Sequence, residues 1–140
     1  MLLHIVARGK IGRSPEAELV ERYLKRIGWP TKVTELPDRG GKMPDLPANA
    51  ASIVLDERGK ALASSELAAK LESWRDGGMR EARFFIGAAD GHDEEMRRSA
   101  DLLLSFGPAT WPHMLARAML AEQLFRSVSI LANHPYHREG

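Results

Sequence analysis

The densest group of chemically useful side chains lies near the end of the chain, in the run Asn133-His134-Pro135-Tyr136-His137-Arg138-Glu139. An imidazole titrates near neutral pH, a guanidinium binds anionic oxygen or phosphate, and a phenol can stack on a base or hydrogen-bond to it. Terminal segments are usually polar and poorly ordered, so this concentration predicts that the tail belongs to a site. The structural alternative is that His134-Pro135 only stops a helix, that Tyr136 packs, and that Arg138 pairs with Glu139.

Two other candidate segments each follow a predicted strand. Asp56 comes directly after one strand, where a carboxylate can meet ligand hydroxyls or amines, although the charged run 56–60 is more typical of a solvated turn. Gly87 begins a small-residue turn, 87–91, that would let the backbone approach a ligand closely. Its glycine spacing fits neither the dinucleotide motif nor the phosphate loop, so an ordinary turn is the alternative.

A third candidate segment runs from Phe106 to His113 and is stiffened by Pro108 and Pro112. Its backbone groups could bind the edge of an adenine while Phe106 or Trp111 provides apolar surface. The alternative is an ordinary proline-containing connector whose histidine starts a helix.

Metal binding is the other chemistry that histidines suggest. His113, His134 and His137 could be imagined as ligands, but no carboxylate pattern of a known metalloenzyme accompanies them. The chain has no cysteine, which excludes Cys-based zinc sites and iron–sulfur clusters. We therefore predict no metal, and keep a His-dependent metal hydrolase only as a third hypothesis.

The elements that must position these segments alternate between strands and helices. Apolar runs predict the strands, and helical spacing with capping and stop signals predicts the helices. Strands are expected at 2–7, 31–36, 52–55, 82–86 and 102–106, and helices at 15–27, 65–76, 92–100 and 114–132, with Ser64 or Ser65 capping the second helix. The pattern predicts an α/β fold, a mostly parallel sheet flanked by helices, with ligands bound beyond the carboxyl ends of its strands.

Two segments go beyond this alternation. Residues 37–51 have no clear period and form an unusually long loop, which is either functional or mobile. The last predicted helix is apolar around much of its circumference, so it needs more than one burial partner. A symmetric dimer and a central position in the monomer core explain this helix equally well.

Composition narrows the class of protein. The 140 residues favour one domain, 1–140, and 44% hydrophobic with 28% charged residues suits a core with an ordinary polar surface. A formal net charge of only +1 means that any contact with nucleic acid depends on local patches. The absence of cysteine fits a reducing compartment, and the sequence has neither a secretory signal nor a membrane span. We expect a cytoplasmic location.

Taken together, four segments resemble the ribosomal RNA large subunit methyltransferase H family in kind and in order. They are a strand ending in Leu55-Asp56, a strand ending in Ile86 and the turn 87–91, the run Trp111-Pro112-His113, and the terminal motif 133–139. The terminal motif is highly specific, and the resemblance covers essentially the whole chain.

The resemblance implies a fold, a reaction and a partner. The fold would be of the SPOUT class, with a trefoil knot in the C-terminal part, and the protein would be a homodimer. It would use S-adenosyl-L-methionine to methylate N3 of pseudouridine 1915 in helix 69 of 23S rRNA on assembled ribosomes. The cofactor would be bound by Leu55, Gly87, Phe106, Gly107, Pro108, Ala109, Thr110 and Trp111, and the reaction would be served by His137, Arg138, Tyr136 and His113.

Two departures from the family pattern affect these expectations. Ala88 stands where a second glycine is usual, and the chain is shorter than typical members within residues 37–51. Ala88 motivates the alternative of a non-catalytic ribosome-binding or assembly factor with the same fold. RNA contacts are expected from local cations, namely Arg8, Lys10, Arg13, Arg39, Lys42 and Arg138.

Overall fold

The computed structural model describes residues 1–87 and 94–136. In this part of the chain, five strands form one sheet in the order β2-β1-β4-β3-β5, and every neighbouring pair is parallel. The strands are β1 (Leu2–Arg8), β2 (Thr31–Leu36), β3 (Ala50–Ala61), β4 (Glu81–Ile86) and β5 (Leu102–Ser105). The helices are α1 (Pro15–Arg26), α2 (Ser64–Asp76), α3 (Glu94–Ser99) and α4 (His113–Leu131). The predicted α/β class with a parallel sheet is confirmed.

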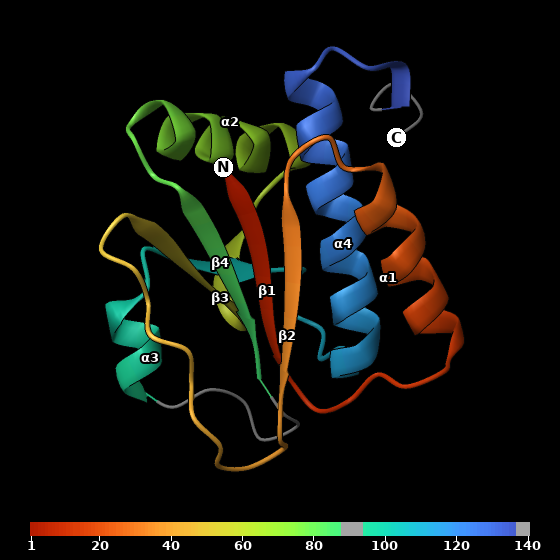
Figure 1. Cartoon of the computed structure of the whole chain (residues 1–140), viewed down its shortest axis with the longest axis vertical. Coiled ribbons are helices and arrows are strands. Elements are labelled where there is room, and N and C mark those ends of the chain that lie inside the picture. The colour runs from red at the N-terminus through yellow and green to blue at the C-terminus, as the bar shows by residue number, and fades with distance from the viewer. Residues whose placement is uncertain (88–93, 137–140) are drawn as a thin grey trace.

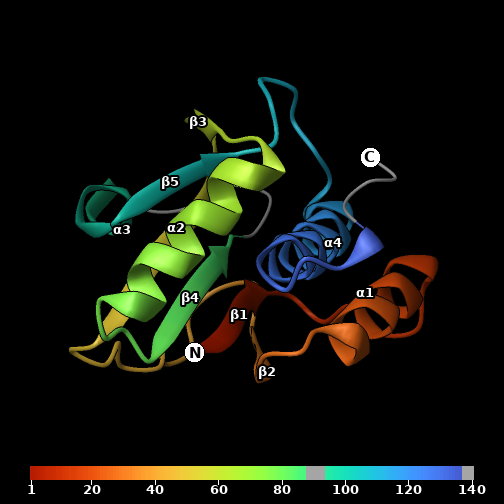
Figure 2. The same ribbon diagram turned by 90° about the horizontal axis from the view of Figure 1, so that it is seen from above.

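The two faces of the sheet are covered differently. Side chains alternate across a strand, so Leu3 and Ile5 of β1 face the main core, where they meet apolar residues of α2, α4 and the end of α1. Val6 points to the other face, which is covered by α3 and by the segment between β2 and β3 (Figures 1 and 2). Three helices therefore close one side of the sheet, while a short helix and an irregular segment close the other.

Local sequence signals explain the first helix well and the second less well. The Ser14 hydroxyl accepts a hydrogen bond from the Ala17 backbone N–H at 3.0 Å, as expected of a helix cap. The predicted serine cap of α2 is wrong. Ala63 occupies the cap position, its N–H donates to the Glu66 side chain at 2.8 Å, and the Ser64 hydroxyl instead donates to Gln123 of α4 at 2.6 Å.

Strand β3 is longer than its apolar run predicts, and it is irregular. Leu55 and Lys60 both pair with Leu104 of β5, so residues 56–59 bulge away from the ladder before pairing resumes. The expectation of a solvated charged turn at 56–60 is therefore wrong in part. Gly59 permits the return, because a Cβ at this position would lie 2.5 Å from the Leu103 carbonyl.

Helix α4 packs against both α1 and α2 over the sheet. Leu120 and Leu124 are fully buried in the main core, and Ala118 and Ala121 meet α1. Burial within one chain thus accounts for much of the apolar circumference of this helix. Leu115 and Met119 are only partly covered by the described residues.

Candidate functional site

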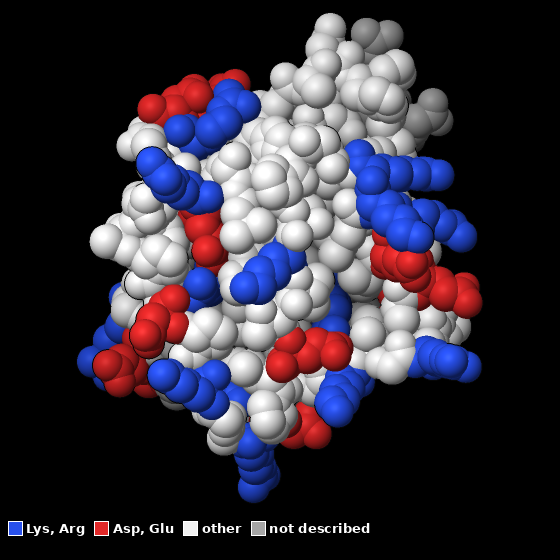
Figure 3. Space-filling view, in the orientation of Figure 1, with Lys and Arg blue, Asp and Glu red and all other residues white. Residues whose placement is uncertain are grey.

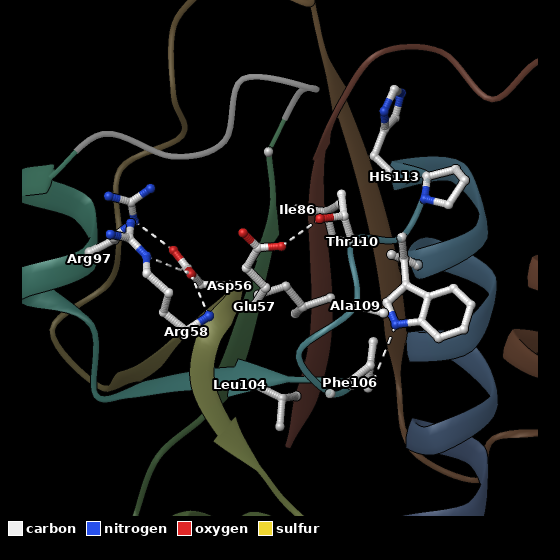
Figure 4. Close-up of a pocket in the computed structure, with 16 residues that line it drawn as sticks. Asp56, Glu57, Arg58, Ile86, Arg97, Leu104, Phe106, Ala109, Thr110 and His113 are labelled. Atoms are coloured by element: carbon white, nitrogen blue, oxygen red, sulfur yellow. Dashed lines mark hydrogen bonds and ion pairs between the residues drawn. The ribbon is translucent and has the colours of Figure 1, made fainter.

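The carboxyl ends of β3, β4 and β5 surround a cavity of about 700 Å³ (Figure 4). This volume is within the range typical of small-molecule sites. The walls come from the β3 bulge, the end of β4, helix α3, the 106–112 loop and the first turn of α4. The lining residues are Leu55, Asp56, Glu57, Arg58, Ile86, Gly87, Arg97, Leu104, Phe106, Gly107, Ala109, Thr110, Trp111, Pro112, His113 and Ala116.

One wall is an ordered carboxylate. Asp56 accepts from the Arg97 Nε of α3 at 2.6 Å and from the Arg58 backbone N–H at 2.9 Å. Burial alone would raise the pKa of Asp56, but these hydrogen bonds outweigh it and hold the pKa below its usual value. Asp56 therefore stays ionised near neutral pH and fastens α3 to the pocket.

The opposite wall, the 106–112 loop, is held by hydrogen bonds from within the pocket. The Thr110 hydroxyl donates to the Glu57 carboxylate at 2.8 Å, which joins the loop to the β3 bulge (Figure 4). The Trp111 indole N–H donates to the Phe106 carbonyl at 3.2 Å, although 42% of Trp111 is exposed. Ser105 accepts from the Gly107 backbone N–H at 3.0 Å. These hydrogen bonds give the loop a defined shape at the cavity.

Apolar side chains form the inner part of the cavity. Leu55, Ile86, Leu104 and Phe106 line it, and Gly87 adds no side chain at the end of β4. A site of this kind can enclose a flat heterocycle between aliphatic groups, while backbone N–H and C=O groups of a loop recognise its edge.

His113 lies between the cavity and the loop after β1, where Arg117 forms a second polar cluster. His113 lines the cavity, and its Nε2 lies 3.7 Å from where a Cβ on Gly9 would stand. One turn along α4, the buried Arg117 donates to Glu35 at 2.5 Å and to the Gly9 carbonyl at 3.0 Å. Helix α4 is therefore tied to the loop after β1 next to the cavity.

Tyr136 lies elsewhere in this chain. Asn133 adopts a left-handed backbone conformation, with φ of 56°, and the chain turns back toward α4. The Tyr136 ring packs 4.5 Å from that of Phe125, and its hydroxyl donates to Glu122 at 2.8 Å, with Arg126 over the ring. Burial, and hydrogen bonds with Glu122 and with Tyr23 of α1, raise the pKa of Tyr136, so its phenol is a donor rather than a base.

The structure brings most of the predicted pocket residues together. All the predicted cofactor residues except Pro108 line the cavity, as does His113, whereas Tyr136 does not. His137, Arg138 and Ala88 lie outside the described residues. Arg97 was not foreseen, because the sequence predicts a short helix before β5 but not which of its side chains turns toward Asp56.

Residues 1–87 and 94–136 contain no group of three or more His, Asp or Glu side chains arranged to hold a metal ion. Within the same residues, no helix is both long enough and apolar enough to cross a membrane.

Comparisons with known proteins agree with one another. A family model described as a predicted SPOUT methyltransferase matches residues 1–137. A ribosomal RNA large subunit methyltransferase H from Novosphingobium aromaticivorans is 70% identical over 142 residues, and one from Rhizorhabdus wittichii is 67% identical over 140, each match covering the full length of both chains. The solved structure of a probable methylase family protein from Haemophilus influenzae is similar in fold, with a TM-score of 0.61. The match covers 96% of this chain and 69% of the Haemophilus influenzae chain, at 14% sequence identity.

Proposed function

The chain belongs to the SPOUT methyltransferase family, among its ribosomal RNA large subunit methyltransferase H members, and we propose that it methylates ribosomal RNA with S-adenosyl-L-methionine as the donor. The proposed acceptor is N3 of the helix 69 pseudouridine in 23S rRNA. The observation that carries the proposal is the cavity at the carboxyl ends of β3, β4 and β5, which gathers three segments that are distant in sequence. Assembled ribosomes as substrate imply a cytoplasmic site of action.

The cavity residues fit this cofactor in size and chemistry. Leu55, Ile86 and Leu104 provide apolar contact for an adenine, and the backbone of the 106–112 loop offers polar groups for its edge. Asp56 and Glu57 offer carboxylates to ribose hydroxyls or to the ammonium of the methionine part. When bound, the cofactor supplies an electrophilic methyl group on a sulfonium.

The protein has two tasks in this reaction. It must align the acceptor nitrogen for in-line transfer, and it must handle the N3 proton, because the neutral imide is a weak nucleophile. His113 at the cavity and His137 of the tail are the candidates for accepting or relaying that proton. Arg138 is the candidate for stabilising negative charge on the base, and Tyr136 is a hydrogen-bond donor or stacking partner.

A homodimer would bring the tail to a pocket. Tyr136 packs against Phe125 of α4 and does not line the cavity of its own chain. The partly covered Leu115 and Met119 of α4 provide apolar surface for a second copy. We therefore include a dimer in the proposal, with the tail of one subunit serving the pocket of the other, and the trefoil knot that the family resemblance implies.

Two measurements test the proposal. Mass spectrometry of 23S rRNA from cells lacking this protein should show an unmethylated helix 69 pseudouridine, with methylation restored by the purified protein and S-adenosyl-L-methionine. Unchanged methylation would refute the assignment. Calorimetry separates the non-catalytic alternative, because a folded dimer with no detectable cofactor binding would be a binding factor rather than an enzyme.

A further inference from the structure

We propose that residues 37–45 form an arm that is fastened by hydrogen bonds at both ends, each of which we call a strap. The arm holds Arg39 and Lys42 against RNA phosphates beside the cofactor pocket. The identity of the RNA rests on the proposed function, whereas the arm itself rests on contacts in this chain. The sequence predicts only that residues 37–51 are either functional or mobile. The described contacts show that the segment is fastened at both ends.

The first strap is Arg8, at the end of β1. Its guanidinium donates to the Pro37 carbonyl at 3.1 Å and also to the Gly40 carbonyl. Gly40 and Gly41 have φ of 70° and 73°, a left-handed conformation that favours glycine, and a Cβ on Gly41 would lie 2.9 Å from the Pro37 ring. The turn therefore has one tight shape that a single arginine holds.

The second strap is Arg83 on β4, which is only 4% exposed. Its Nη1 donates to the carbonyls of Pro44 and Asp45 at 2.9 and 3.0 Å, and its Nε donates to Glu81 at 2.6 Å. Glu81 also contacts His4 Nδ1 at 2.9 Å. Two hydrogen bonds from a buried, paired guanidinium fix the far end of the arm to the sheet.

An apolar contact lies between the straps. Met43 packs against the smaller core cluster on this face of the sheet, which includes Val6 and Phe85. With Arg8 before it and Arg83 after it, the backbone on both sides of Lys42 is fixed. The side chains of Arg39 and Lys42 themselves are exposed.

Within the described part of the chain, Arg39 and Lys42 differ from the buried arginines in having no carboxylate partner. Among the described residues, Arg39 and Lys42 have no ion-pair partner within 4.0 Å, whereas Arg97 and Arg117 are each paired with a carboxylate. Lys10 and Arg13, in the loop after β1, are likewise exposed, and among the described residues they have no such partner. Figure 3 shows cationic side chains projecting from the end of the molecule where the loops after β1 and β2 lie, with carboxylates between them.

The arm lies next to the pocket. A Cβ placed on Gly9, directly after β1, would be 3.0 Å from Asp38 and 3.7 Å from His113. His113 lines the cavity, so the base of the arm and the pocket meet at Gly9. Phosphates flanking a base at the cavity would come within reach of the arm.

Phosphate is the chemistry that fits this arrangement. Contacts to phosphates position a protein on a nucleic acid without reading sequence, and each neutralised phosphate makes binding more sensitive to salt. A chain with a formal net charge of +1 has no strong overall attraction to a polyanion. Unpaired cations on a fixed backbone next to the site would supply that attraction locally.

The test compares two matched double variants of the full-length protein. Arg39→Gln with Lys42→Gln removes the proposed contacts, and Lys70→Gln with Arg80→Gln removes one exposed lysine and one exposed arginine from other surfaces, at the α2 helix and the amino end of β4. Binding to ribosomes from cells lacking this protein is measured over a range of salt concentrations. The arm variant should bind roughly tenfold more weakly at low salt, and the slope of log K against log salt should fall by about 1.5.

The control variant should keep a salt slope close to that of wild type, with an affinity for ribosomes within about twofold of wild type. Cofactor affinity by calorimetry should be unchanged in both. Equal salt slopes for the arm variant and wild type would overturn the proposal. If wild type methylates ribosomes and the arm variant does so equally well, the arm fails and the proposed function stands.

A third variant tests the strap itself. In the wild-type protein one guanidinium nitrogen, Nη1, donates to both carbonyls. Arg8→Lys keeps the charge but replaces the planar guanidinium with a compact, flexible ammonium that is not preorganised to reach both. Hydrogen exchange in residues 37–42 should become faster and ribosome affinity should fall a few-fold with the salt slope unchanged. Unchanged exchange and affinity would show that Arg8 does not hold the arm.

If wild type binds ribosomes with the expected slope but never methylates them, the proposed function fails and the arm stands.

Discussion

The cavity that we propose as the cofactor pocket and the cluster around Tyr136 are assembled by different means. The pocket joins segments from three parallel strands, Leu55 of β3, Gly87 after β4 and the 106–112 loop after β5, whose carboxyl ends must meet at one edge of the sheet. Most partners of Tyr136 are near it in sequence, because Glu122, Phe125 and Arg126 all lie on α4, within 14 residues of Tyr136, and only Tyr23 of α1 among its polar partners is distant. The pocket is thus positioned by topology, and Tyr136 by the turn at Asn133 and its contacts with the helices.

This difference bears on function. The residues that line the described cavity are far from the tail, so we expect the cavity to bind cofactor without it. Tyr136 packs against α4 and does not line the cavity of its own chain, so it can serve the chemistry only at another pocket, which under our proposal is that of the second subunit. Binding and transfer should therefore be separable by mutation.

The largest expected effect comes from removing the tail. A chain ending at Ala132 should lose methyl transfer by at least about a hundredfold, because the groups proposed to handle the proton and the negative charge are gone. It should bind S-adenosyl-L-methionine within about threefold of wild type, since no pocket residue is removed. Single-turnover methylation of ribosomes and calorimetry measure the two properties.

A chain ending at Glu139 is the matched control and should be fully active. Gel filtration checks that the shortened chain is still a dimer. Transfer that survives the removal of residues 133–140 would make the tail structural, and cofactor binding lost together with transfer would remove the proposed separation.

The contrast also explains what the sequence could predict. Alternating strands and helices imply a parallel sheet, and a parallel sheet brings the residues that follow its strands to one edge, so Leu55, Gly87 and the 106–112 loop were foreseeable as neighbours. The position of Tyr136 was not, because it depends on one left-handed residue, Asn133, rather than on periodicity.

The bulge in β3 could not be predicted from the sequence either. Local sequence reads residues 56–60 as a charged turn, and only the pairing of Leu55 and Lys60 with the same residue of β5 shows that the strand resumes. The Asp56–Arg97 contact depends on that bulge and on the docking of α3. Both are tertiary features for which charge and spacing give no signal.

The second prediction tests how strictly topology fixes the pocket. Gly59→Ala places a Cβ 2.5 Å from the Leu103 carbonyl, which is backbone and cannot move aside easily. We expect the free energy of unfolding in urea to fall by about 2 kcal/mol and cofactor affinity to fall with it, because the strained return distorts the bulge that carries Asp56 and Glu57. Gly28→Ala is the control, since nothing lies within 4 Å of its Cβ, and it should leave both quantities nearly unchanged. Equal stability of the two variants would show that β3 and β5 tolerate a wider separation.

The smallest expected effect concerns the Glu57–Thr110 hydrogen bond, which joins the bulge to the 106–112 loop. Thr110→Val keeps the shape but removes the donor, so the loop loses one fixed contact, and we expect cofactor affinity to fall about threefold to tenfold, as for the loss of one hydrogen bond. Thr110→Ser keeps a hydroxyl and should retain most of the affinity. Glu57→Gln keeps an acceptor oxygen and should behave like Thr110→Ser if the bond only positions the loop. A loss in Glu57→Gln as large as in Thr110→Val would instead mean that the negative charge itself contacts the cofactor, and the pocket wall would then bind its ligand rather than merely hold the loop in place.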